Sequence, residues 1–353
     1  MEEKYKWNLE DILKNMNEFE ETKKSMEEDL NKIEEFKGFL CKSSDNLYKA
    51  YSIYEKALEK LEKLYAYGML KYNLDMSSQE AIKLYKQVES LETLFSTKTS
   101  FMTPEITYED VNKIKGFLNE NTALQRYKRD IEDILEEKEH TLSKEGEELL
   151  ANYSEIFSAP ENTFDILTNA EFKFGNLINE NGEEVELTES NYTLYLKSKN
   201  VNVRKQAFNL MYSQYSKFVN TITELYLSNV KASSVTAKLR HYKSSLERAV
   251  KQDDASIKVY DSLIESIHDG LKVNHKFIEL KKKILNKQDF HMYDLYVNPF
   301  ETEKDEITFE EARKEVEEAL SIMGEEYLNK LKEAFDNRWI DVFATPNKKG
   351  GAY

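Results

Sequence analysis

Residues 203–230 read VRKQAFNLMYSQYSKFVNTITELYLSNV, and this stretch decides the fold class. Large apolar side chains recur in it every three or four residues, which is the period of one face of an α-helix. Neither glycine nor proline occurs anywhere in residues 183–269. We therefore predict one continuous helix over 203–230, about 42 Å long at ~1.5 Å per residue. The face that we expect to be buried carries Phe208, Tyr215, Ile222 and Tyr226.

The scarcity of turn-forming residues extends over the whole chain. Its 353 residues include 10 glycines and 4 prolines, whereas average usage of ~7% and ~5% would give about three times as many. This composition predicts a mainly α fold of many helices and excludes an all-β sandwich. The 22 tyrosines and 18 phenylalanines supply enough apolar surface to exclude a disordered chain.

Two apolar stripes at helical spacing mark the first hundred residues. The first consists of Leu47, Tyr51, Tyr54, Leu58, Leu61 and Tyr65. The second consists of Ala81, Leu84, Tyr85, Val88, Leu91 and Phe95. Each stripe marks one face of an amphipathic helix. A second helical block follows over residues 108–157, and we expect Pro160 to close it, because proline interrupts a helix.

Two parts of the chain show the alternating pattern of β-strands. Phe172–Phe174 and Val185–Leu187 alternate on either side of Asn181-Gly182, a dipeptide that favours a tight hairpin turn. We predict a small hairpin or mixed element near residues 164–187. Residues 338–343 alternate as well, and they predict a further strand.

The charge balance excludes several classes of partner. There are 66 acidic against 50 basic residues, a formal net charge of −16, whereas nucleic-acid-binding proteins generally present a basic surface. No apolar run approaches the ~20 residues of a membrane span, and the sequence shows no export signal. The single cysteine, Cys41, fits a reducing compartment. We therefore expect a cytoplasmic protein that binds neither nucleic acid nor membrane.

The residues themselves show no catalytic signature. The sequence lacks H-E-x-x-H and both glycine fingerprints for phosphate binding. Cys41 has no indicated histidine partner, so we expect a half-buried thiol rather than a nucleophile. One helix face combines carboxylates with two histidines, namely Asp261, Glu265, His268, Asp269, His275 and Glu279. Zinc ligands are usually spaced more closely, so we expect a solvated surface there.

Several segments nevertheless resemble, in the same order, those of one peptidase family. They are Trp7–Ile12, Asn181–Thr188, Val203–Phe208, Arg240–Ala249, Tyr293–Tyr296, Arg338–Val342 and Lys348–Tyr353. On these segments, which span the chain, it resembles the oligoendopeptidase F family, zinc metallopeptidases related to thimet oligopeptidase. The family often has Arg-Ser where Lys349 and Gly350 stand, which is a mild departure.

The resemblance implies the front half of a zinc metalloendopeptidase. In the family, H-E-x-x-H supplies two zinc ligands and the general-base glutamate, and a later glutamate supplies the third ligand, all beyond the segment that ends this chain. We therefore expect zinc in the intact enzyme, none held by this chain, and no hydrolysis by this chain alone. The implied division is a helical region over 1–107, a small domain with the hairpin over 108–188, and the first part of the catalytic domain over 189–353.

The implied substrates are short peptides, and the implied role of this chain is a helical lid and one wall of the cleft. The resemblance assigns Gly350, Gly351, Ala352 and Tyr353 to substrate binding, through main-chain hydrogen bonds to an added peptide strand. An ordinary turn after an edge strand explains the two glycines equally well. We also expect Lys348–Tyr353 to be exposed and mobile in this chain, because it loses the partners that follow in the family.

Two other interpretations remain open. A non-catalytic helical homologue or fragment that binds peptides or regulates another protein would share all of these segments. An unrelated helical scaffold explains the composition but not the order of the motifs. The sequence indicates neither the cleavage preference nor the oligomeric state.

Overall fold

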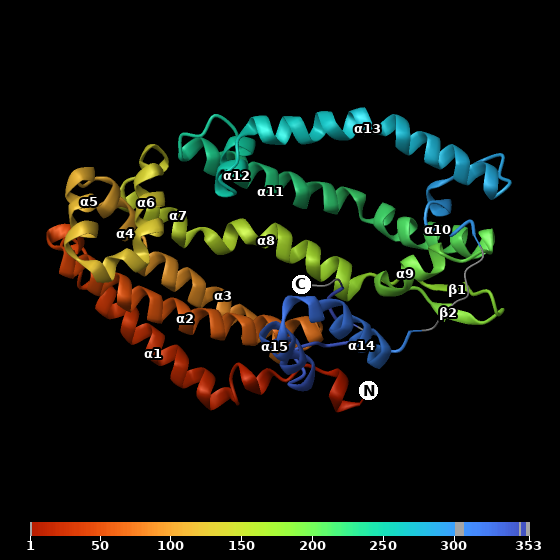
Figure 1. The fold of residues 1–353 in the computed structure, drawn as a ribbon, viewed down its shortest axis with the longest axis horizontal. Helices are drawn as coiled ribbons and strands as arrows, with labels where there is room; N and C mark the ends of the chain where they lie inside the picture. Colours follow the sequence, from red (N-terminus) through yellow and green to blue (C-terminus); the bar gives the residue numbers. More distant parts are fainter. Residues whose placement is uncertain (1, 301–306, 346, 351–353) are drawn as a thin grey trace.

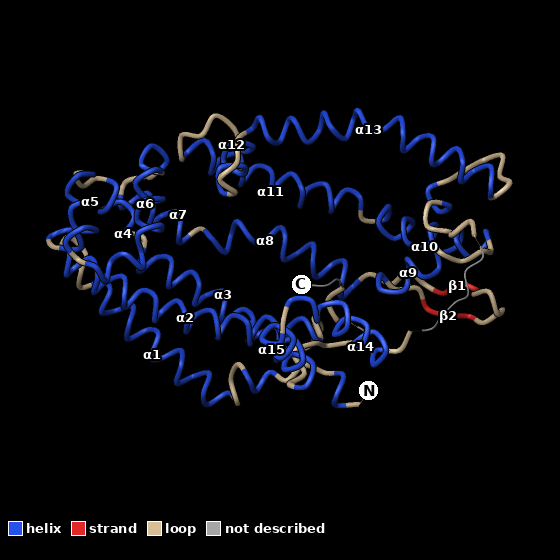
Figure 2. Tube along the Cα trace, in the orientation of Figure 1, coloured by secondary structure: helices blue, strands red, loops and turns tan. Residues whose placement is uncertain are grey.

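The structure is a computed structural model that describes residues 2–300, 307–345 and 347–350. Helices make up most of it, and the strands in these residues form one small hairpin (Figure 2). The long helices lie in layers (Figure 1), with α8 (Ser154–Asp165) between the N-terminal helices and the pair α11 (Val219–Leu239) and α13 (Ile257–Ile284). The mainly α prediction is confirmed.

Seven helices precede α8, and serine or asparagine side chains cap several of them. The side chains of Ser43 and Ser78, for example, accept hydrogen bonds from the first turns of α2 and α3. The helices are α1 (Met16–Glu34), α2 (Ser44–Leu74), α3 (Gln79–Thr99), α4 (Met102–Thr107), α5 (Val111–Glu120), α6 (Lys128–Glu136) and α7 (Lys144–Asn152).

The N-terminal helices share one continuous apolar core. Every residue of the two stripes predicted on α2 and α3 is buried or half-buried. Phe19 and Ile33 of α1 are fully buried against them. Gly68 permits the close approach of α2 and α3, because a Cβ there would lie 3.0 Å from a Val88 methyl. This part of the chain therefore completes its own core.

Pro160 lies inside α8 rather than closing the helical block, so that prediction is wrong. It is the seventh of the twelve residues of α8, so the proline removes one main-chain hydrogen bond of the helix without ending it. The helix then widens into a π-helical turn, Ile166–Glu171, before the chain leaves it at Phe172.

The predicted hairpin is present, but its strands are shorter and shifted. β1 (Asn176–Ile178) pairs antiparallel with β2 (Glu184–Glu186), with Leu177 opposite Val185. Gly182 adopts φ +81° in the turn, as the Asn-Gly signal predicts. Phe172–Phe174 precedes β1 as buried irregular chain, so its alternation reflects burial and not a strand.

The predicted continuous helix over 203–230 is two helices, α10 (Val201–Lys217) and α11, and the prediction is wrong in this respect. Phe218 breaks the helix with φ −108° and ψ 14° and packs its ring against Phe172. Its side chain belongs to the small core around the hairpin, so tertiary packing overrides helical continuity. The remaining helices are α9 (Glu189–Leu196), α12 (Ser245–Gln252), α14 (Phe309–Leu320) and α15 (Glu325–Asp336).

The face predicted to be buried on these two helices is also only partly correct. α10 buries Val203, Ala207 and Met211, which lie next to the predicted face. Phe208, Tyr215 and Ile222 are half-buried. Tyr226 is 68% exposed, because in the part of the chain that the structure describes nothing covers that side of α11.

Residues 338–343 form no strand, so the second β prediction is wrong. The segment runs beside the N-terminus, where the N–H of Asn8 donates to the carbonyl of Arg338 and the N–H of Val342 donates to that of Tyr5. These bonds do not extend into a ladder, because the N-terminal partner consists of short 3₁₀ turns, Glu3–Tyr5 and Leu9–Asp11. Among the described residues, no helix has the length and apolar character needed to cross a membrane.

Candidate functional site

The C-terminal tail, residues 347–350, lies across the junction of α2 and α3 and the π turn that follows α8. The N–H of Lys349 donates to the carbonyl of Asn73 at 2.9 Å, and the N–H of Met76 donates to the carbonyl of Asn347 at 2.9 Å. The N–H of Gly350 donates to the side-chain oxygen of Asn169 at 3.2 Å. Figure 1 places this end of the chain beside the end of α8.

Two ion pairs also hold the tail. The Lys348 ammonium lies 2.5 Å from a carboxylate oxygen of Asp341, and these side chains are only 13% and 3% exposed. The Lys349 ammonium lies 2.7 Å from Asp165. For Lys348 to Gly350 the expectation of an exposed tail is therefore wrong, because Asp341, α2, α8 and the π turn supply its partners. Gly351, Ala352 and Tyr353 lie outside the described residues.

A cavity of about 450 Å³ opens beside the tail. Its walls come from the tail, the π turn, the chain leaving the hairpin and the start of α9. A Cβ at Gly350 would lie 3.6 Å from a carboxylate oxygen of Glu189, so the glycine backbone lies close to this wall. The Tyr215 hydroxyl donates to Glu189 at 2.6 Å, and burial together with this bond raises the pKa of Tyr215. The cavity therefore has the backbone of the tail on one side and polar side chains such as Glu189 on the other.

A larger cavity of about 860 Å³ lies at the other end of α8. Residues of α2, α3, α7, α8, α11 and α12 line it, among them Tyr51 and Arg248. In its wall Arg240 donates two hydrogen bonds to the carboxylate of Glu147, at 2.8 and 2.7 Å. Its volume falls within the ~300–1,000 Å³ typical of ligand pockets.

The chain after Arg240 is fixed by stacking and charge. His140 stacks on the ring of Tyr242 with 3.6 Å between ring centroids, and its Nδ1 lies 2.8 Å from the carbonyl oxygen of Arg240. The Tyr242 hydroxyl donates to Glu137 at 2.6 Å. Burial, followed by this bond to Glu137, raises the pKa of Tyr242. The connection from α11 to α12 is therefore anchored on the N-terminal helices, which sets the position of the cavity wall.

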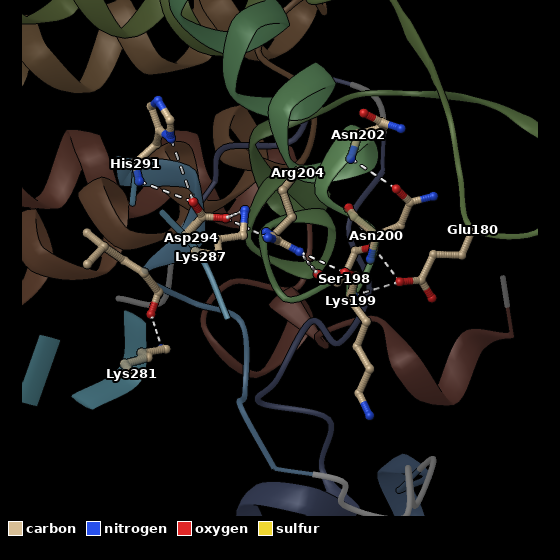
Figure 3. A network of polar contacts seen from close by, with 11 residues as sticks. Glu180, Ser198, Lys199, Asn200, Asn202, Arg204, Lys281, Lys287, His291 and Asp294 are labelled. Carbon is tan, nitrogen blue, oxygen red and sulfur yellow. Dashed lines mark hydrogen bonds and ion pairs between the residues drawn. The ribbon is translucent and has the colours of Figure 1, made fainter. Parts of the chain in front are cut away.

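A buried ionic network joins two of the segments that the sequence analysis treated separately (Figure 3). The Arg204 guanidinium on α10 donates to Asp294, and these side chains are 2% and 0% exposed. Lys287 lies 2.9 Å from the same carboxylate, and the N–H of His291 donates to it. Burial alone would raise the pKa of Asp294, but the bonds from Arg204 and Lys287 outweigh it and lower that pKa.

Sequence reasoning missed this network, although it quoted both segments. The available signal was an arginine at position 204 on the face that carries Val203, Ala207 and Met211. A charged residue on an apolar face is rarely left unpaired. The network fastens the chain after α13 to α10, so it organises the fold and contacts neither cavity.

The described residues do not fit a zinc site. No cluster of three or more His, Cys, Asp or Glu side chains in them is arranged to hold a metal ion. His268 and His275 are exposed on α13, with the acidic residues of the same face around them. Cys41 is buried, and burial together with the nearby Glu105 raises its pKa to about 12, which makes it a poor nucleophile.

Comparison with known proteins identifies the family. The family model for oligopeptidase F matches residues 105–174, and that for peptidase family M3 matches residues 194–353. The chain is 33% identical to oligopeptidase PepF of Bacillus subtilis over 98% of its own length and 52% of that protein. It is 36% identical to an oligoendopeptidase F homolog of Lactococcus lactis over 99% of its own length and 58% of that protein.

A solved structure supports the same family. The crystal structure of oligoendopeptidase-F from Enterococcus faecium superimposes with a TM-score of 0.79 at 32% identity, covering 90% of this chain and 60% of that one. The chain belongs to the oligoendopeptidase F family, within peptidase family M3. It spans between half and three fifths of the length of these relatives.

Proposed function

We propose that this chain forms the helical lid and one wall of the peptide cleft in a zinc metalloendopeptidase that hydrolyses short peptides. The observation that carries the proposal is the match to oligoendopeptidase F proteins along nearly the whole chain at 32–36% identity. The two cavities at the ends of α8 support the proposal of a cleft along this part of the chain. A cytoplasmic location agrees with the single free cysteine, Cys41.

The division into 1–107, 108–188 and 189–353 remains part of the proposal. The apolar core of the N-terminal helices also contains Ile114, Leu118 and Ile131, so it runs past the proposed boundary at 107 and joins the first region to the start of the second. The second, smaller core around the hairpin joins residues from both sides of position 188, including Leu187 and Val203, and so supports a tight junction there.

In this proposal the rest of the enzyme packs on α11 and α13. Of the 28 residues of α13, only Lys281 is buried. Large apolar side chains stand exposed along the helix, namely Val259, Leu263, Ile267, Val273, Phe277 and Leu280. Isolated helices are only marginally stable in water and depend on packing of an apolar face. An exposed apolar surface of this extent is typical of an interface.

In the proposed enzyme, this chain binds the peptide, and the rest of the protein carries the zinc chemistry. Zinc in the intact enzyme would activate the water that attacks the peptide bond. We assign no zinc ligand to this chain, because its described residues offer no suitable cluster. Its own part is to bind and orient the peptide: Gly350 lies in the wall of the smaller cavity, where an extended peptide would add to the main chain.

Complementation tests this proposal. The purified chain is mixed with the part of the Lactococcus lactis homolog that it does not match, and cleavage of a quenched fluorescent peptide is followed with and without zinc. We expect no cleavage by the chain alone and zinc-dependent cleavage by the mixture. The double variant Val273→Lys, Phe277→Lys should prevent association, whereas Glu28→Lys on the exposed side of α1 should not.

Two results would contradict the proposal. Cleavage by the chain alone would show that it contains a complete active site. Stoichiometric zinc that survives dialysis against a weak chelator would place ligands on this chain and return attention to His268 and His275. An associated but inactive mixture would favour a non-catalytic homologue.

A further inference from the structure

Arg248 differs from the other arginines of this acidic chain. Six of the seven arginines pair with a carboxylate, as Arg126–Glu55, Arg129–Asp133, Arg204–Asp294, Arg240–Glu147, Arg313–Glu317 and Arg338–Glu3. For Arg248, no carboxylate oxygen of the described residues lies within 4.0 Å. This is unexpected in a chain of 66 acidic residues. Arg248 is half-buried on α12 and lines the larger cavity.

The cavity around Arg248 holds other polar groups without protein partners. Tyr51, which lines it, is 4% exposed, and its buried hydroxyl forms no hydrogen bond with the described residues. Arg240 is already neutralised by Glu147 and does not compete for an anion. Asp130 also lines the cavity, but it is exposed and forms no ion pair there with the described residues. Arg248 is therefore the free positive group of the cavity.

An arginine presents a planar fork of donors that suits a carboxylate. Every unmodified peptide carries one carboxylate at its C-terminal end, whatever its sequence. The remaining wall suits the rest of a peptide, because Leu58, Phe95 and Phe157 provide apolar surface beside the hydroxyl groups. Recognition of the terminus would hold peptides of many sequences in one direction.

The separation of the two cavities along α8 can be expressed as a length of extended peptide. Phe157 of α8 lines the larger cavity, and Thr168 of the π turn lines the smaller one. Eleven residues of helix at ~1.5 Å each separate them by about 16 Å. An extended peptide advances ~3.3 Å per residue, so about five residues cover this distance.

We propose that Arg248 binds the C-terminal carboxylate of the substrate peptide in the larger cavity. The inference deepens the proposed function and rests on it, because it requires that the cleft binds peptides. Binding orders the peptide and makes or breaks no covalent bond.

The test compares two forms of one peptide. A fluorescently labelled, neutral octapeptide is prepared with a free C-terminal carboxylate and as the C-terminal amide, and binding to the 353-residue chain is followed by fluorescence anisotropy. We expect the free acid to bind about tenfold more tightly, as a charge-assisted hydrogen bond provides. Arg248→Gln should abolish the preference, and Arg248→Lys should restore part of it.

A matched control and a second peptide keep the test specific. Arg129→Gln removes an arginine that pairs with Asp133 and Asp254 outside the larger cavity, so it should leave the preference intact. An amidated peptide with one internal aspartate should bind no better than the neutral amide. If that peptide binds as tightly as the free acid, Arg248 recognises side chains and the inference is wrong.

The outcomes separate the two proposals. Equal affinity for acid and amide, or a preference that survives Arg248→Gln, overturns the role of Arg248 and leaves the peptide cleft standing. No binding of either peptide overturns the cleft on this chain and the inference with it. The melting temperature of Arg248→Gln, which we expect to be unchanged, shows that a lost preference is not a lost fold.

Discussion

The N-terminal helices and the pair α11–α13 use similar side chains in opposite ways. α1, α2 and α3 enclose their leucines, isoleucines and phenylalanines in one core. α11 and α13 expose theirs, and the buried residues are Ala237 on the first and Lys281 on the second. The difference teaches that helical periodicity creates an apolar face but does not say whether the chain itself covers it.

The two parts consequently depend on different interactions. The N-terminal part has close apolar packing, as at Gly68 and Val88. The second part relies on a small core around Phe172 and on the buried network of Arg204 and Asp294. Its outer helices need a partner, and the unmatched part of the relatives is the partner that we propose.

The largest expected effect comes from Phe19→Ala. Phe19 is fully buried, with its ring centroid 6.2 Å from that of Tyr67. Truncation of a buried phenylalanine costs about 3–5 kcal/mol in the free energy of unfolding, because the cavity it leaves refills only partly. Phe277→Ala on α13, 58% exposed, is the matched control and should cost less than about 0.5 kcal/mol. Urea unfolding monitored by circular dichroism measures both.

Equal costs for these two variants would remove the contrast between the regions. In that case the α13 face is already covered in solution, and sedimentation would show a dimer or larger assembly.

Asp294→Asn should come next, at about 3 kcal/mol, because it leaves Arg204 and Lys287 without their counter-charge in a buried site. Asp289→Asn, on the exposed chain just before it, should be neutral. The folded pKa of Asp294 lies below its unfolded value, so its contribution is present above about pH 4 and is lost as the pH falls through the folded pKa. In unfolding curves between pH 7 and pH 3, the stability gap between wild type and variant should therefore be constant from pH 7 down to about pH 4 and should narrow as the pH falls further.

A gap between wild type and Asp294→Asn that stays constant down to pH 3 would show that the carboxylate charge is not what stabilises the network.

Lys348→Met tests the buried ion pair that ties the tail to Asp341, with an expected cost of about 2 kcal/mol. The variant leaves Asp341, 3% exposed, without its cation. Lys349→Met should cost only about 0.5 kcal/mol, because its pair with Asp165 is more exposed. Thermal unfolding together with limited proteolysis of the tail distinguishes the two variants. Equal sensitivity of both would show that burial of the ion pair does not decide its strength.

Gly350→Ala should have the smallest effect, within about 0.5 kcal/mol. Its Cβ would meet neighbouring atoms at 3.6 and 3.9 Å, which are ordinary contacts. A clear loss of stability would mean that Gly350 is required by the fold. An unchanged stability with reduced cleavage in the complemented enzyme would support its place in the peptide-binding wall.

The sequence-based predictions were correct where the interacting residues are close in the sequence, and they failed where those residues are far apart. The stripes on α2 and α3 and the Asn181-Gly182 turn depend on neighbours within a few residues, and both were predicted correctly. The break at Phe218 depends on Phe172, forty-six positions earlier in the chain, and was missed. The tail was expected to be exposed because it loses the partners that follow in the family, and its partners on α2 and α8, which are distant in sequence, were missed.

The sequence alone therefore determined the helical class, the hairpin turn and, through ordered motifs, the family. These depend on backbone propensity, on the spacing of apolar residues and on resemblance, all of which can be read from short stretches of the sequence. Only the tertiary structure showed that Arg204 meets Asp294, that Lys348 pairs with Asp341 and that Arg248 has no described partner. The reason is physical: a charge is neutralised by whatever the fold brings within a few ångströms, and sequence distance does not limit that choice.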